Sequence, residues 1–264
     1  MNIFFREFRA NFKSLMIWIF IQVLFCVVGF SKFTAYYKNP DMLVVLKALP
    51  QALLDAFNMK SFNLTTLVGF YGIMISYYAL ILAIAAAMWG SGIISKEERD
   101  KTVEFSLTLP VTRARLVTSK IAVVFVNCII LLLVTWGITV FNAKNYEPDA
   151  VFYTYLKISM LAYFMIQMIF MALGVFLGCA MKQHKRSGSM AVSILLGTYV
   201  LSVIAGLDKK VDFLKYFSPF KYFDPLLLLK ESRIETIYIV LSVAIVAVAI
   251  VAAYMTYAKR DLYI

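Results

Sequence analysis

The sequence predicts an all-α integral membrane protein with six transmembrane helices and an N-terminal amphipathic interfacial helix. Hydrophobic residues make up 62% of the 264 residues and charged residues only 16%, whereas a soluble domain is about 45–50% apolar and about 25% charged. Six stretches without Asp, Glu, Lys or Arg are each long enough to cross a bilayer core, which takes roughly 20 helical residues. The alternating pattern of a membrane β-barrel is absent.

Each predicted span coincides with or overlaps one of these charge-free stretches. The spans cover residues 14–37, 64–95, 116–143, 152–181, 187–207 and 234–258, and the stretches are Ser14–Ser31, Ser61–Ser95, Ile121–Ala143, Ile158–Met181, Ser187–Leu207 and Thr236–Ala258. All six prolines lie outside the stretches, as uninterrupted helices require. Six spans leave no length for a separate soluble domain, so residues 1–264 form a single transmembrane domain.

The N-terminal segment Asn2–Lys13 has the pattern of an amphipathic helix. Phe4, Phe8 and Phe12 repeat every four residues, and charged residues fill the other side. Such a helix is expected to lie in the membrane interface before the first span, and a plain extension of that span is the alternative. No small-x-small cleavage site follows the first stretch, so we expect a retained helix rather than a signal peptide.

Basic residues near the helix ends predict that both termini are cytoplasmic. Segment 95–120 holds six Lys and Arg residues and Lys182–Arg186 holds three, and short cytoplasmic loops are enriched in such residues. In this orientation residues 208–233 are extracellular, although they also carry six basic residues. The net charge of +11 is spread over every loop, which suits anionic lipid headgroups better than nucleic acid.

The loop between the second and third spans is the least membrane-like part of the chain. Glu97 and Lys101 form a favourable i,i+4 pair, which favours a helix. Pro110 ends that helix, and Thr112 is a suitable N-cap for the third span. The residue pattern by itself fits both a solvated loop and a rigid lever that passes motion from a soluble partner to the spans.

The same loop resembles the signature of type-2 ABC exporter permeases, the membrane subunits that pair with a separate ATP-binding cassette protein. The matching residues are Glu97, Glu98, Arg99, Thr102, Glu104, Leu107, Pro110, Arg113 and Lys120. Lys101 stands where the family usually has Gly, and Tyr216–Phe223 is similar to the family's stretch between the fifth and sixth spans. The specific motif covers about one loop, and the architecture covers the whole chain.

This resemblance implies that the loop docks on an ABC ATPase subunit. The implied coupling residues are Glu97, Glu98, Arg99, Thr102, Glu104, Phe105, Leu107, Pro110 and Arg113. It also implies a second permease copy or paralogue, so that two chains form one export pathway. The expected partners are therefore the ATPase, the second permease, the lipid bilayer and the exported substrate, with no nucleic acid.

The chain lacks the residues for ATP chemistry of its own. It has no Gly-Lys pair and hence no phosphate-binding P-loop, so ATP and Mg are expected in the partner ATPase. His184 is the only histidine, and one histidine cannot build a metal site. We therefore expect a non-enzymatic subunit with no catalytic, cofactor-binding or metal-binding residues.

Two other classes of function stay open. An ion-coupled transporter or channel usually keeps an ionisable residue within the membrane, and the charge-free stretches argue against it. A non-transport membrane sensor or scaffold is the second alternative. The 22 Phe, 16 Tyr and 13 Met residues would suit export of an amphipathic peptide, drug or other hydrophobic compound, from the plasma membrane of a bacterium.

Small and polar residues inside the spans are expected to join helices. The spacing Gly174-x-x-x-Gly178 is typical of close helix packing in membranes, here within one chain rather than between two. Gln22, Asn127 and Gln167 are expected to bridge helices, and lining a transport path is the alternative.

Overall fold

A computed structural model of the chain describes residues 3–39, 41, 62–99, 112–181, 184–207 and 209–259. Six helices in this part are long and apolar enough to cross a membrane. They are α1 (Ile3–Tyr36), α4 (Leu67–Arg99), α6 (Arg113–Ala143), α7 (Ala150–Ala180), α8 (His184–Leu207) and α11 (Thr236–Ala258). The described residues contain helices and no strands, which confirms the predicted fold class.

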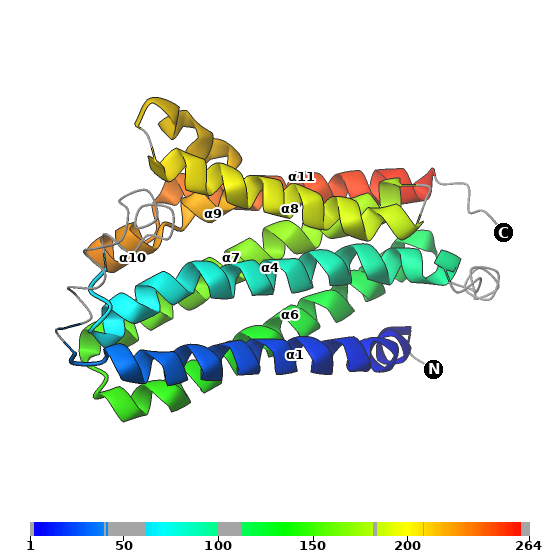
Figure 1. Cartoon of the computed structure of the whole chain (residues 1–264). Helices are drawn as coiled ribbons and strands as arrows, with labels where there is room; N and C mark the ends of the chain where they lie inside the picture. The colour runs from blue at the N-terminus through cyan, green and yellow to red at the C-terminus, as the bar shows by residue number, and fades with distance from the viewer. Residues whose placement is uncertain are drawn as a thin grey trace.

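The six long helices lie side by side and alternate in direction (Figure 1). The starts of α1, α6 and α8 therefore meet the ends of α4, α7 and α11 at one end of the bundle, which we call the termini end because both chain termini lie there. The opposite end is called the far end. The cytoplasmic location of the termini stays a prediction.

The first helix begins much earlier than the predicted first span. The segment 3–13 continues into the span without a break as part of α1. At a rise of about 1.5 Å per residue, this helix is roughly 50 Å long and exceeds the bilayer core of about 30 Å. The other long helices begin and end within about one turn of the predicted spans, and an interfacial position for 3–13 stays a prediction.

Shorter helices cover the far end. They are η2 (Lys144–Tyr146), η3 (Lys209–Phe217), α9 (Pro219–Tyr222) and α10 (Pro225–Glu231). Pro219 and Pro225 occupy the first turns of α9 and α10, where a missing N–H costs nothing and the fixed φ suits a helix. Asp224 caps α10 by accepting a hydrogen bond from Leu226 N at 2.9 Å. The two prolines thus start helices in the segment 208–233.

Helices α4 and α7 form the centre of the bundle. In the most apolar part of each, 61% of the residues are buried, against 17–33% in the other four long helices. The two backbones touch, because a Cβ placed on Gly174 would lie 2.5 Å from Ala87 O, and one on Gly90 would lie 2.5 Å from Met171 O. A Cβ on Gly178 would lie 2.9 Å from Ser91 O. This contact bears out the interpretation of Gly174-x-x-x-Gly178 as packing within one chain.

Aromatic side chains join α1, α4 and η2 at the far end. The rings of Phe33 and Phe70 stack with centroids 4.4 Å apart, and the ring of Tyr146 lies 4.8 Å from Phe33. The Tyr146 hydroxyl donates to Phe30 O at 3.0 Å, and the Tyr37 hydroxyl donates to Tyr146 O at 3.2 Å. The loops that follow α1 and α6 are therefore held together.

An exposed ion pair lies next to this aromatic cluster. Lys38 Nζ is 2.8 Å from Glu147 Oε2, and both residues have positive φ, of 54° and 52°. The hydrogen bond raises the pKa of Lys38 and lowers the pKa of Glu147. The pair adds a polar link between the same two loops.

The polar side chains in the middle of the bundle are fully buried. Gln167 on α7 donates to Cys128 O on α6 at 3.4 Å, which agrees with the bridging role expected from the sequence. Gln22 Nε2 donates to Cys26 Sγ on its own helix, at 3.9 Å. In the described part of the chain, both side-chain polar atoms of Asn127 and the Oε1 atoms of Gln22 and Gln167 have no hydrogen-bond partner.

We predict that Gly174→Ala destabilises the protein by about 1–3 kcal/mol, because the new Cβ would collide with α4 backbone and the helices would have to separate. Thermal unfolding in detergent would measure the loss. Gly92→Ala is the matched control, since a Cβ there has nothing within 4 Å and Ala is about 0.5–1 kcal/mol better than Gly in a helix. Equal melting temperatures for the two variants would contradict the close α4–α7 contact.

Candidate functional site

The segment predicted to couple to an ATPase is bracketed by the end of α4 and the start of α6. Thr102, Glu104, Phe105, Leu107 and Pro110 lie outside the described residues. The backbone of Glu97, Glu98 and Arg99 is described and forms the last turn of α4, and Arg113 begins α6. The structure therefore shows how the two ends of the segment are anchored.

Thr112 fixes the start of α6. Its hydroxyl accepts a hydrogen bond from Arg115 N at 3.3 Å, and its own backbone is extended. An N-cap of this kind satisfies one of the backbone N–H groups that a helix start leaves without a partner. The N-cap predicted from the sequence is confirmed, so the chain re-enters the bundle at a defined residue.

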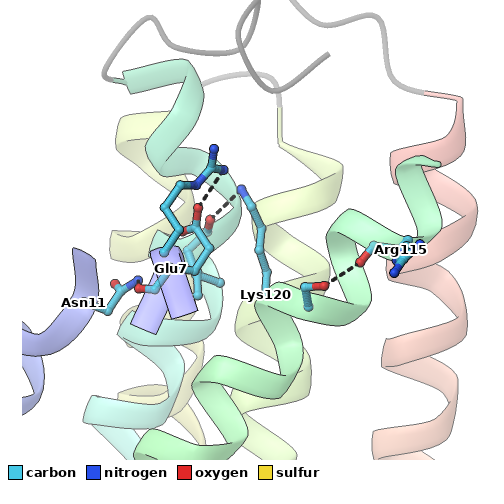
Figure 2. A network of polar contacts seen from close by, with 7 residues as sticks. Glu7, Asn11, Arg115 and Lys120 are labelled. Carbon is cyan, nitrogen blue, oxygen red and sulfur yellow. Dashed lines mark hydrogen bonds and ion pairs between the residues drawn. The ribbon is translucent and has the colours of Figure 1, made fainter. Parts of the chain in front are cut away.

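Lys120 ties α6 to α4. The side chain is 1% exposed, and its Nζ donates to Ile93 O on α4 at 3.0 Å. Figure 2 shows Lys120 reaching across from α6 to the neighbouring helix. A buried ammonium needs such partners, because desolvation otherwise makes its charge costly. The two helices that flank the predicted coupling segment are thus joined directly.

Arg113 ties α6 to the end of α11. Its Nη1 donates to Ala258 O at 3.2 Å and to Tyr257 O at 3.5 Å. These carbonyls belong to the last turn of α11, where a helix lacks internal donors and favours positive charge. One turn further along α6, the hydroxyls of Thr118 and Tyr254 are 2.6 Å apart. A contact between Arg113 and an ATPase stays a prediction.

Two further hydrogen bonds connect α4 to its other neighbours at this end. Trp89 Nε1 donates to Ser14 Oγ on α1 at 2.9 Å, and Ser187 Oγ on α8 donates to Ser95 Oγ at 3.5 Å. We call the contacts of Trp89, Ser95, Arg113, Thr118 and Lys120 the coupling-end network. Through it, α4 and α6 are connected by side chains to α1, α8 and α11.

A buried acidic residue lies beside this network. Glu7 on α1 is 6% exposed, and its Oε1 is 3.1 Å from Arg6 Nη2. Figure 2 shows Glu7 and Lys120 entering the same region from α1 and α6. The sequence did not predict the burial of Glu7 or Lys120. The pattern of apolar residues predicts that a single Glu or Lys near a helix end is exposed to solvent.

We predict that Lys120→Met lowers the stability by about 1–3 kcal/mol, because Ile93 O loses a charged donor in a buried position. Thermal unfolding in detergent would detect this, and hydrogen exchange should increase at the end of α4. Lys144→Met is the control, because Lys144 is exposed. If both substitutions had the same small effect, Lys120 would not join the two helices.

A comparison with protein families gives a match that covers nearly the whole chain. The family model described as ABC-2 family transporter protein matches residues 1–262. No individual curated protein matches the chain. The match includes all six long helices and both anchors of the segment 96–113, and the family implies an ABC ATPase as partner. The chain therefore belongs to the ABC-2 family of transporter proteins and is a multi-pass ABC transporter permease.

Proposed function

We propose that this permease is the membrane subunit of an ATP-driven exporter, in which a separate ATPase acts on the segment 96–113. The coupling-end network is the observation that carries this proposal. A soluble partner that moves this segment would pull on α4 and α6 together, because Lys120 joins them. It would also reach α11 through Arg113, α8 through Ser95 and α1 through Trp89.

ATP and Mg would be bound by the partner and not by this chain. Closure of the ATPase on ATP would displace the end of α4, and the network would convert that displacement into a tilt of the surrounding helices. The short helices at the far end are held by other contacts, such as the hydrogen bond from the Tyr155 hydroxyl to Pro225 O at 2.7 Å. The two ends of the bundle could therefore move by different amounts.

The proposed assembly contains two permease chains around one pathway, in a bacterial plasma membrane with the termini in the cytoplasm. The second chain, a copy or a paralogue, is the one that the resemblance of segment 95–120 to type-2 ABC exporter permeases implies. The proposed cargo is an amphipathic peptide, drug or other hydrophobic compound. The 22 Phe and 16 Tyr residues support a hydrophobic cargo.

We predict that the double variant Glu97→Lys/Glu98→Lys captures its ATPase at least about tenfold less well, because like charges in an interface repel and misdirect docking. Co-purification from cells that express both subunits would measure capture. Glu147→Lys/Glu231→Lys is the matched control, since it reverses two charges at the far end. Unchanged co-purification of the Glu97/Glu98 variant would refute docking at this segment.

The orientation has its own test. The three native cysteines are all buried, so a single introduced cysteine can be labelled with little background. We predict that a membrane-impermeant maleimide labels Arg233→Cys in intact cells and labels Arg115→Cys only after permeabilisation. Both native residues are exposed, so the opposite pattern would place the termini outside the cell.

A further inference from the structure

A cavity opens at the far end between α4, α7, α8 and the short helices α9 and α10. The cavity is partly open to the surface, and small-molecule ligands bind in concave sites of this kind. It extends from Asp224 near the surface to Ile166 on α7. Ile166 lies about 24 Å along α7 at 1.5 Å per residue, so the cavity reaches the middle of that helix.

The walls of this cavity are aromatic and aliphatic, with a few polar groups. The aromatic lining residues are Tyr77, Tyr163, Tyr199, Phe220 and Phe223. In the described part of the chain, no residue makes a hydrogen bond of good geometry with the buried Tyr163 hydroxyl. The wall thus offers a donor that a ligand could use, next to surfaces that suit an apolar body.

A part-buried ion pair lines the cavity towards the far end, and its two members are not equally available. Each carboxylate oxygen of Asp224 accepts one hydrogen bond, Oδ2 from Lys221 Nζ at 2.6 Å and Oδ1 from Leu226 N at 2.9 Å, and keeps a second acceptor position. An ammonium carries three N–H donors, and Lys221 uses one of them on Asp224. The side chain of Lys221 is also more exposed, at 22% against 14%. Lys221 is thus the more accessible member of the pair, and a negatively charged group would approach it from the cavity.

We propose that this cavity binds amphipathic organic anions, with the acidic group on Lys221 and the apolar body between the aromatic side chains. The inference rests on the proposed function, because it names the chemical class of cargo that the permease would hold. Lys221 would donate its spare N–H groups to the carboxylate or sulfonate of the ligand. Tyr163 would offer its hydroxyl deeper in the cavity.

The test is binding of three probes with the same aromatic body to the full chain in nanodiscs of phosphatidylcholine. The probes are 2-naphthoate, 2-naphthalenemethanol and 2-naphthylmethylamine, and isothermal titration calorimetry with empty nanodiscs subtracted gives their affinities. We expect 2-naphthoate to bind about tenfold more tightly than the other two, since hydrogen bonds to charged groups are the stronger ones. Stronger binding of the amine would overturn the proposal.

Substitutions of the ion pair give effects of opposite sign. Asp224→Asn frees Lys221 and keeps a residue suited to cap α10, so binding of 2-naphthoate should tighten or hold. Lys221→Gln/Asp224→Asn removes the cation without leaving a part-buried charge unpaired, and should lower the affinity to that of the alcohol. Tyr163→Phe should weaken binding by a few fold with no change in melting temperature. Equal affinities in all variants would refute the site.

Two controls separate this inference from others. Lys157→Gln changes an exposed lysine of α7 that does not line this cavity. It should leave the affinity for 2-naphthoate unchanged. A loss of affinity equal to that of the Lys221 variant would mean that the overall charge of the protein drives binding. The measurement contains no ATPase. Loss of ATPase capture with intact naphthoate binding would therefore reject the proposed coupling and not the cavity, and the reverse result would reject only the cavity.

Discussion

The backbone of α4 touches the backbone of α7, and the rest of the bundle is arranged around this contact. Inside a bilayer, apolar side chains gain little by leaving lipid for protein, so close approach and van der Waals packing must hold helices together. Gly90 and Gly174 allow that approach because each faces a backbone carbonyl of the other helix. The remaining helices pack around this pair, and a much smaller share of the residues in their most apolar parts is buried.

The kinds of contact between helices also differ between the two ends of the bundle. Towards the termini end, hydrogen bonds between helices, such as that from Lys120 to Ile93 O, accompany the close contact of α4 with α7. At the far end, Phe33 stacks on Phe70, and Tyr146 packs against Phe33. Helices are therefore joined mainly by hydrogen bonds and close backbone contact towards one end and by aromatic side chains at the other.

The sequence predicted the features that depend on lipid or on local backbone chemistry. Charge-free stretches predict helices because a bilayer admits only helices and closed β-barrels, and the alternation of a barrel is absent. Thr112 caps α6 because its role depends only on the next three residues. Arg113 shows the limit. The resemblance to the permease family assigned it to the ATPase interface, and the pattern of the sequence did not show that it also binds carbonyls of α11 at the other end of the chain. The sequence did not predict the cavity at Lys221 either, because its walls come from five separate helices.

Three side-chain amides in the middle of the bundle affect the free energy needed to separate its helices. The side-chain oxygens of Gln22, Asn127 and Gln167 are buried without partners in the described part of the chain, and each such group costs about 1–3 kcal/mol. Helix separation that admits water would recover part of that free energy while apolar contacts are lost. The arrangement in the structure is therefore less stable relative to a hydrated one than a bundle with a wholly apolar core would be. A modest input of work at one end could then be enough to wet the interior.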